Sequence, residues 1–222
     1  MHANVTALTQ SARNATDGVG MLQVADGALA QMTTLLNRAV TLATEAATGT
    51  VTDTQRTALD AEYTSIKDQI DKIGGNTTYN GSAVFSGNTV SIFMSDGSGA
   101  GDTSLDVSSA LLAIDSTNQL ALAGDLTSDT NATTELGVIN TAIATVAGLR
   151  GTTGAFINQL QAAGNVMSSQ MQNLSAAEDG IRAADIPAEV ANLTKYNILS
   201  QTGISALAQA NQMQQAVLKL LQ

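Results

Sequence analysis

The side chains of this 222-residue chain that could take part in chemistry are few and isolated. His2 is the only histidine and cysteine is absent. A histidine-based catalytic triad, a thiolate site or a histidine metal cluster therefore cannot be built from one chain. His2 lies beside the first residue, where a solvated side chain is expected. We predict no catalytic residue, no metal ligand and no cofactor, and a protein that is not an enzyme.

One short stretch, residues 96–102, is rich in glycine and aspartate and could suggest a ligand-binding loop. A phosphate-binding loop requires a following Lys-Ser/Thr pair, and a calcium-binding EF-hand requires a glutamate at a fixed spacing. The sequence supplies neither. Because Gly and Asp commonly mark turns, we predict a connecting loop here.

The charge balance also restricts the partners of the chain. Nineteen acidic residues against nine basic ones give a net charge of −10, and phosphate binding needs clustered Lys and Arg. We therefore expect no nucleic-acid partner. No run of eighteen apolar residues occurs, and we expect no membrane insertion.

The elements that would position side chains are mainly long helices. From about residue 3 to residue 47, apolar residues recur every seven positions, which predicts one helix of roughly 65 Å. The seven-spaced positions are Leu8, Ala15, Leu22, Leu29, Leu36 and Ala43. With no Trp, three Phe and three Tyr, small aliphatic side chains must fill the core, which favours long paired helices.

Further helices follow along the chain. Gly49 marks the end of the first helix, and capping residues 52–54 predict a second, antiparallel helix that ends at Gly74 and Gly75. A third spans residues 136–181 and packs along the first. A fourth runs from Pro187 to residue 222, and no earlier helix is left over to cover its apolar face.

Between the second and third helices the pattern changes to short alternating runs. Residues 90–94 and 105–107 predict a β-hairpin. The rest of the segment up to residue 131 is weakly patterned, and we expect it to be exposed. The fold class is thus mainly α: an elongated antiparallel bundle of long helices, a coiled-coil-like rod with a small β-hairpin insertion.

Two blocks of residues at the two ends of the chain resemble bacterial flagellin. The first block is residues 11–18 (SARNATDG), 26–29 (DGAL), 70–73 (IDKI) and 78–81 (TYNG), and the second is residues 173–175 (NLS), 181–186 (IRAADI), 189–190 (EV) and 207–212 (LAQANQ). Together they span well over half of the chain in the family's order.

The resemblance implies a structural subunit of the extracellular flagellar filament, secreted and assembled with other flagellin subunits to support motility. It also implies two domains: residues 1–182 form a rod with a variable insertion at about 84–131, and residues 183–222 form a C-terminal helical segment. The alternatives are a hook-filament junction protein of the same superfamily and a surface adhesin. Flagellins begin with a helical segment that pairs with the C-terminal helix. This sequence lacks that segment, so we expect the chain alone to be monomeric or to aggregate irregularly.

The resemblance further implies two recognition surfaces. In this family, the flagellin-sensing Toll-like receptor binds a surface with an Arg, a Leu and a Glu, which by register correspond to Arg38, Leu42 and Gln69. Because Gln69 departs from the family's Glu, weakened receptor binding is expected. A flagellin export chaperone is expected to hold the C-terminal helix. The residues of that face, expected to serve assembly as well, are Ile204, Leu207, Val217, Leu218 and Leu221.

Overall fold

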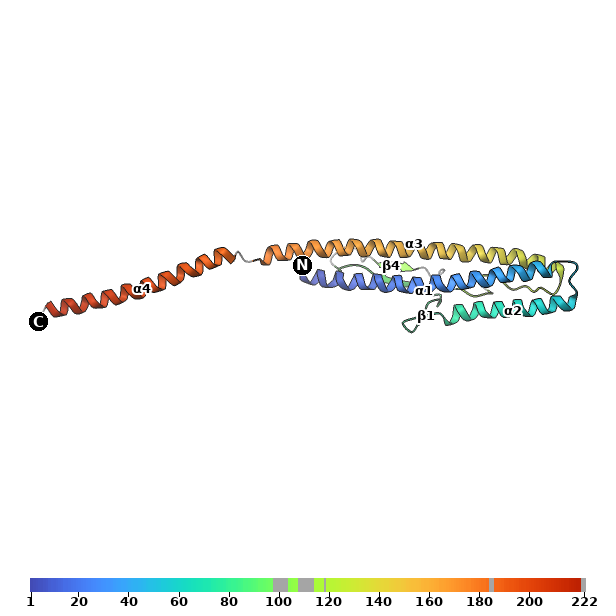
Figure 1. Ribbon diagram of the computed structural model, residues 1–222, viewed down its shortest axis with the longest axis horizontal. Helices are drawn as coiled ribbons and strands as arrows, with labels where there is room; N and C mark the ends of the chain where they lie inside the picture. Colours follow the sequence, from blue (N-terminus) through green and yellow to red (C-terminus); the bar gives the residue numbers. More distant parts are fainter. Residues whose placement is uncertain (98–103, 108–113, 118, 184–185, 221–222) are drawn as a thin grey trace. The chain divides into compact units, whose positions relative to one another are not determined.

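The computed structural model describes residues 1–97, 104–107, 114–117, 119–183 and 186–220. Most of these residues lie in long helices, which confirms the predicted mainly α fold (Figure 1). The helices are α1 His2–Ala46, α2 Asp53–Asn76, α3 Asp129–Arg182 and α4 Ile186–Leu220. Strands β1 Thr78–Tyr79 and β2 Ser82–Ala83 form one antiparallel pair, and β3 Val90–Phe93 and β4 Ser104–Val107 form another.

The chain divides into two compact units, Met1–Ser175 and Ala176–Gln222. The first unit holds α1, α2, the strands and most of α3. The second holds the end of α3 and α4. The predicted assignment of residues 1–182 to a rod and 183–222 to a terminal segment stays a prediction.

In the first unit, α1 packs against both α2 and α3 (Figure 1). Arg38 of α1 bonds to Glu62 of α2, and the contacts between α1 and α3 run from Thr9–Met171 to Asp26–Arg150. The contacts between α1 and α2 run from Arg38–Glu62 to Ala46–Arg56. In both pairs of helices the residue number rises in one helix as it falls in the other. Both α2 and α3 are therefore antiparallel to α1, as the sequence predicted.

The core of this unit follows the seven-residue seam. Leu8, Ala15, Leu22, Leu29, Leu36 and Ala43 are all buried, with exposed fractions of 3% or less. Leu22, Leu29 and Leu36 are completely buried, and burying such a side chain stabilises the fold by roughly 1.5–3 kcal/mol. The seam is the main apolar contact surface of α1.

The second helix starts where the sequence predicted and ends later. Thr52 is the N-cap, and its side chain and that of Gln55 form a reciprocal capping box. The predicted end at Gly74 and Gly75 differs by one residue from the observed end, which is at Asn76. Gly74 is a packing residue: a Cβ at this position would overlap with the backbone carbonyl oxygen of Ile114.

The predicted β-hairpin is confirmed as the β3–β4 pair, in which Val90 lies opposite Val107. Side chains of α1 hold the end of this hairpin. Ser11 Oγ donates to the Ser95 carbonyl at 2.7 Å, and Asn14 Nδ2 donates to the Phe93 carbonyl at 3.2 Å. The hairpin therefore packs directly on the first half of α1.

The prediction that the segment before α3 is exposed was wrong. Leu120, Leu122 and Leu126 are buried, with exposed fractions of 2%, 2% and 0%. Two α2 side chains bind the backbone of this segment: Asp71 accepts from the Ser116 N–H at 2.8 Å, and Asp60 accepts from the Leu126 N–H at 2.8 Å. The segment belongs to the core because it packs along α2.

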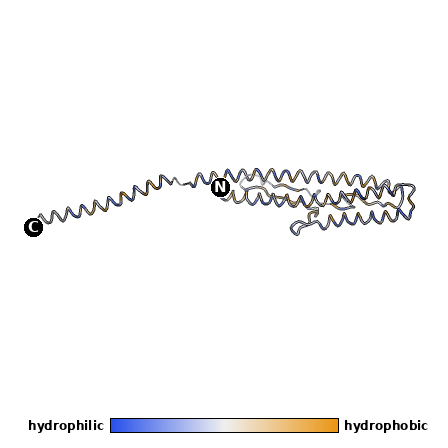
Figure 2. The backbone as a smooth tube through the Cα atoms, in the orientation of Figure 1, coloured by the Kyte–Doolittle hydropathy of each residue, from blue (hydrophilic) through white to orange (hydrophobic). Residues whose placement is uncertain are grey.

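Hydrophobic and hydrophilic residues are interspersed along the helices (Figure 2). Within Asp129–Met213, one window reaches a mean hydropathy of 1.2, which by length and composition would also suit a membrane span. This is weak evidence, because the core helix of a soluble protein satisfies the same criterion. The predicted absence of membrane insertion stays a prediction.

Candidate interaction surfaces

Clusters suited to metal binding are absent from the described part of the chain, where no three His, Cys, Asp or Glu side chains come together. Most of the glycine-rich loop at residues 96–102 lies outside the described residues. Asp96, which is described, accepts a hydrogen bond from Asn4 Nδ2 at 3.2 Å. That contact ties the end of the hairpin to α1.

Arg38 lies on an exposed face of the α1–α2 pair. Its Nε donates to Glu62 Oε1 at 2.7 Å, and both side chains are about half exposed. This hydrogen bond raises the pKa of Arg38 and lowers the pKa of Glu62, so both groups remain charged over a wide pH range. A charged, accessible guanidinium is a common contact residue in protein interfaces.

The other two receptor candidates differ in their exposure. Gln69 is exposed on α2, whereas Leu42 is only 1% exposed. Leu42 lies in the buried seam between Ala39 and Ala46, so it does not share the accessible face of Arg38. Leu42 therefore offers little surface to a receptor, and its part in receptor binding stays a prediction.

A buried polar contact joins α2 to α3. The Tyr63 hydroxyl donates to Glu135 Oε1 at 2.5 Å, and the two residues are 0% and 3% exposed. Burial, with a smaller contribution from the hydrogen bond to Glu135, raises the pKa of Tyr63. No local sequence pattern indicates this pair, because its members are 72 residues apart.

Lys67 and Gly124 complete the surroundings of this pair. Lys67 Nζ lies 4.7 Å from the centre of the Tyr63 ring and donates to the Gly124 carbonyl at 2.9 Å. A Cβ at Gly124 would overlap with Glu135 Oε2. The segment before α3 is thus fixed between α2 and α3 at Gly124.

The second unit presents an apolar helix to solvent. Every described side chain of residues 187–213 is exposed. The large apolar residues among them are Val190, Leu193, Tyr196, Ile198, Leu199, Ile204, Leu207 and Met213, with exposed fractions between 54% and 67%. Of the predicted face, Ile204 and Leu207 are exposed, Val217 and Leu218 lie in α4, where side chains beyond Met213 are not described, and Leu221 lies outside the described residues.

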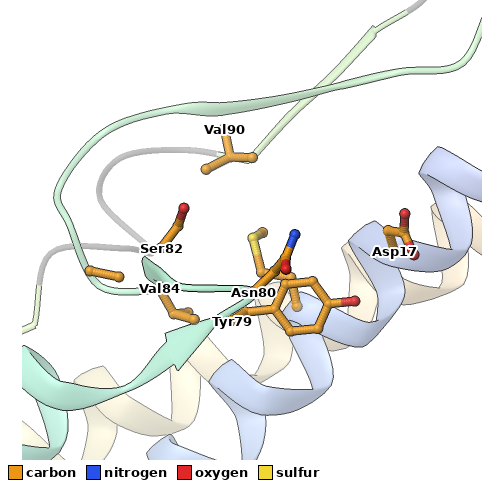
Figure 3. A pocket seen from close by; sticks show the side chains of 8 residues that line it. Asp17, Tyr79, Asn80, Ser82, Val84 and Val90 are labelled. Atoms are coloured by element: carbon orange, nitrogen blue, oxygen red, sulfur yellow. The ribbon is translucent and has the colours of Figure 1, made fainter.

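A cavity of about 720 Å³ lies between α1 and the β1–β2 hairpin. Figure 3 shows Asp17 of α1 on one side, Tyr79 and Asn80 of the hairpin turn on another, and Ser82, Val84 and Val90 around the remaining wall. Asp17, Asn80 and Ser82 are exposed and Val84 is buried. This cavity was not predicted from the sequence, although residues 11–18 and 78–81, which contribute to its lining, carry the flagellin resemblance.

Family models match both ends of the chain. Residues 1–89 match the bacterial flagellin N-terminal helical region, and residues 136–221 match the bacterial flagellin C-terminal helical region. Together the two matches account for most of the chain.

Whole-chain relatives and solved structures agree with these matches. All of this chain aligns with 83% of the Bacillus subtilis flagellin at 32% identity, with 81% of the Halalkalibacterium halodurans flagellin at 30%, and with 82% of the Treponema maltophilum flagellar filament 30.7 kDa core protein at 29%. The Bacillus cereus flagellin structure aligns with a TM-score of 0.61 and 32% identity, over 75% of this chain and 94% of that one.

A second solved structure, a putative flagellar hook-associated protein from Vibrio parahaemolyticus, aligns with a TM-score of 0.63 over 78% of this chain and 92% of that one. At 17% identity this likeness shows a shared fold alone.

Proposed function

This chain belongs to the bacterial flagellin family, and we propose that it serves swimming motility as a subunit of the extracellular flagellar filament. Proteins of this family are structural subunits that assemble with one another and are not enzymes. The hook-filament junction alternative shares the fold, and the flagellin relatives at 30% identity or more favour the filament.

The exposed apolar face of α4 is the observation that best supports assembly. A 35-residue helix without a core of its own gains most of its stability from packing against a partner. Ile204 and Leu207 are each 67% exposed in the single chain. In the domain plan proposed here, residues 1–182 form the rod, with its insertion at about 84–131, and residues 183–222 form the segment that other subunits cover.

The test is a pair of variants made in the bacterium that produces the protein. Leu207→Asp places a charge on the apolar face, and we expect it to abolish filaments and swimming because an unpaired charge would be buried on assembly. Ser205→Asp adds the same charge at an exposed position beside this face and is the matched control. Electron micrographs in which both variants carry filaments of normal length would contradict the assembly role.

Export is the second part of the proposal. Before secretion, the same α4 face would bind the groove of a flagellin export chaperone, as an amphipathic helix commonly does. Titration calorimetry with the chaperone of the producing bacterium tests this directly. We expect Leu207→Asp to weaken binding at least tenfold and Ser205→Asp to leave it unchanged; equal affinities for the two variants would argue against this surface.

Recognition by the flagellin-sensing Toll-like receptor is the third part. Arg38 and Gln69 are both accessible, which supports a contact surface on α1 and α2. Gln69 lacks the charge of the family's Glu, so we expect a reduced response that Gln69→Glu increases. A reporter-cell assay would compare this variant with Thr64→Glu, which adds the same charge at another exposed position of α2. An equal response to both would refute the role of Gln69.

A further inference from the structure

The cavity beside the β1–β2 hairpin combines one carboxylate with neutral polar groups and an apolar wall. Among the described residues that line it, Asp17 alone is charged, and Asn80, Ser82 and Tyr79 are polar. Met21, Val84 and Val90 contribute apolar surface. Figure 3 shows Asp17 on α1 and Tyr79, Asn80 and Ser82 on the neighbouring hairpin.

The hairpin wall of this cavity is held in place by its own backbone and by α1. Asn80 and Gly81 have φ angles of 49° and 78°, the left-handed pair that a tight two-residue hairpin turn requires. The Tyr79 hydroxyl packs on Gly20 of α1, where an added Cβ would lie 2.8 Å from the hydroxyl oxygen. The Val84 N–H donates to the Thr77 carbonyl at 2.9 Å and closes the hairpin. The cavity is therefore formed before any partner binds.

The lining suits a long basic side chain. A lysine or arginine buries its aliphatic stem against apolar surface and directs its charged end to acceptors. Met21, Val84 and Val90 offer the apolar surface, and the Asp17 carboxylate, helped by the Asn80 and Ser82 side-chain oxygens, offers the acceptors. We propose that this cavity receives a lysine or arginine side chain from a second copy of the chain.

The second copy is the favoured partner because the chain assembles with itself and carries suitable cations. In the described part of the first unit, Arg38, Arg56, Lys67 and Arg150 are bonded within the chain. Arg13 and Lys72 are exposed, and the contacts of the described residues include no ion pair for either. Asp17 likewise has no ion pair there, although Arg13 lies one helical turn away. Charge complementarity thus pairs Asp17 with Arg13 or Lys72 of a neighbouring copy.

This inference rests on the proposed function, because the contact forms only between assembled subunits. A filament grows through interfaces in which two different patches meet, so Asp17 and its cation are on different copies. Native protein would be sheared from cells, depolymerised and regrown on filament seeds, and the critical concentration measured by sedimentation. We expect Asp17→Asn to raise it about tenfold, equivalent to about 1.4 kcal/mol, and Asp17→Lys to raise it further.

Asp68→Asn and Asp68→Lys are the matched controls, since Asp68 is exposed on α2 and does not line the cavity. Both should polymerise like the unsubstituted protein, and unchanged circular dichroism would show that every variant is folded. Adding Arg13→Glu or Lys72→Glu to Asp17→Lys exchanges the two charges of the proposed pair, so that an anion again faces a cation. One of these double variants should recover filament growth. Normal growth of Asp17→Lys, or no recovery in either double variant, would overturn the inference while leaving the filament role intact. Failure of the unsubstituted protein to grow would overturn both.

Discussion

Replacement of Tyr63 by phenylalanine tests the buried contact between α2 and α3. The substitution keeps the ring, which is fully buried, and removes the hydroxyl that donates to Glu135 at 2.5 Å. Glu135 is 3% exposed, so water does not replace the lost donor. The variant therefore leaves a carboxylate without its principal partner inside the core.

The expected cost follows from that burial. Leaving a buried carboxyl group without its hydrogen-bond donor costs about 3 kcal/mol, which lowers the midpoint of thermal unfolding by roughly 6 to 12 °C for a chain of this size. Glu135→Gln keeps an acceptor and removes the charge. In that background the loss of the Tyr63 hydroxyl should cost only about 1 kcal/mol, as for a neutral hydrogen bond.

Thermal and urea unfolding followed by circular dichroism would measure both values. Tyr196→Phe is the matched control, because Tyr196 is 67% exposed and the same chemical change there should fall within about 0.5 kcal/mol of the unsubstituted protein. The interpretation of a buried charged contact would be refuted if Tyr63→Phe were as stable as that control. It would also be refuted if Tyr63→Phe lost the same free energy of unfolding with Glu135 as with Gln at position 135.

Four further predictions concern the same unit. Ala121 has a φ of 53°, so Ala121→Gly should stabilise the fold by about 0.5 kcal/mol in urea unfolding, and any loss of stability would contradict strain at this residue. Gly124→Ala would force a methyl group onto the Glu135 carboxylate and should destabilise by roughly 2 kcal/mol, whereas an unchanged midpoint would show that the segment can move away. Burial raises the pKa of Tyr63, so the hydroxyl proton is lost from the unfolded chain at a lower pH than from the folded chain. The stability that this difference contributes should be fully present below about pH 10 and fall above it. Tyr63→Phe should lack this fall in stability at alkaline pH. Hydrogen bonds from neighbouring hydroxyl, amide and backbone donors hold the pKa of Asp125 at about 2, so Asp125 stabilises the fold above its unfolded pKa near 4 and ceases to do so as pH falls through 2. Asp125→Asn should therefore lose less stability in acid than the unsubstituted protein. Identical profiles of stability against pH for the two proteins would refute this.

The helices and their main packing surface were predictable from local pattern. The seven-spaced residues from Leu8 to Ala43 are all buried, because a repeat near the helical period places them on one face. Thr52 caps α2 because its hydroxyl accepts from a backbone N–H three residues away. Each of these signals joins residues within a few turns of one another.

Packing over long distances gave two parts of the chain a role that local signals did not predict. Gly74 and Gly75 indicated a helix end, which lies at Asn76, but only the tertiary structure shows that Gly74 also packs against the Ile114 carbonyl. Leu120 and Leu122 alternate with small residues in a way that could have indicated a buried extended segment, yet their surroundings of Asp, Ser and Asn suggested a surface loop.

Some residues of the candidate surfaces were identifiable from the sequence, and others only from the packing of the helices. The apolar positions of α4 were identified from the sequence, since helical period alone places Ile204 and Leu207 on one face. Spacing also placed Leu42 near Arg38, but only the packing of α1 decided that Leu42 is buried and Arg38 is accessible.

Sequence by itself determined the long helices, the buried seam of α1 and membership in the flagellin family, because each depends on residue order along one or two elements. Tertiary structure alone decided that Tyr63 meets Glu135 and that Asp17 faces Tyr79 and Asn80 across a cavity. These residues are 62 to 72 positions apart, and their contacts depend on how α2, α3 and the hairpin pack against α1, which no local pattern encodes.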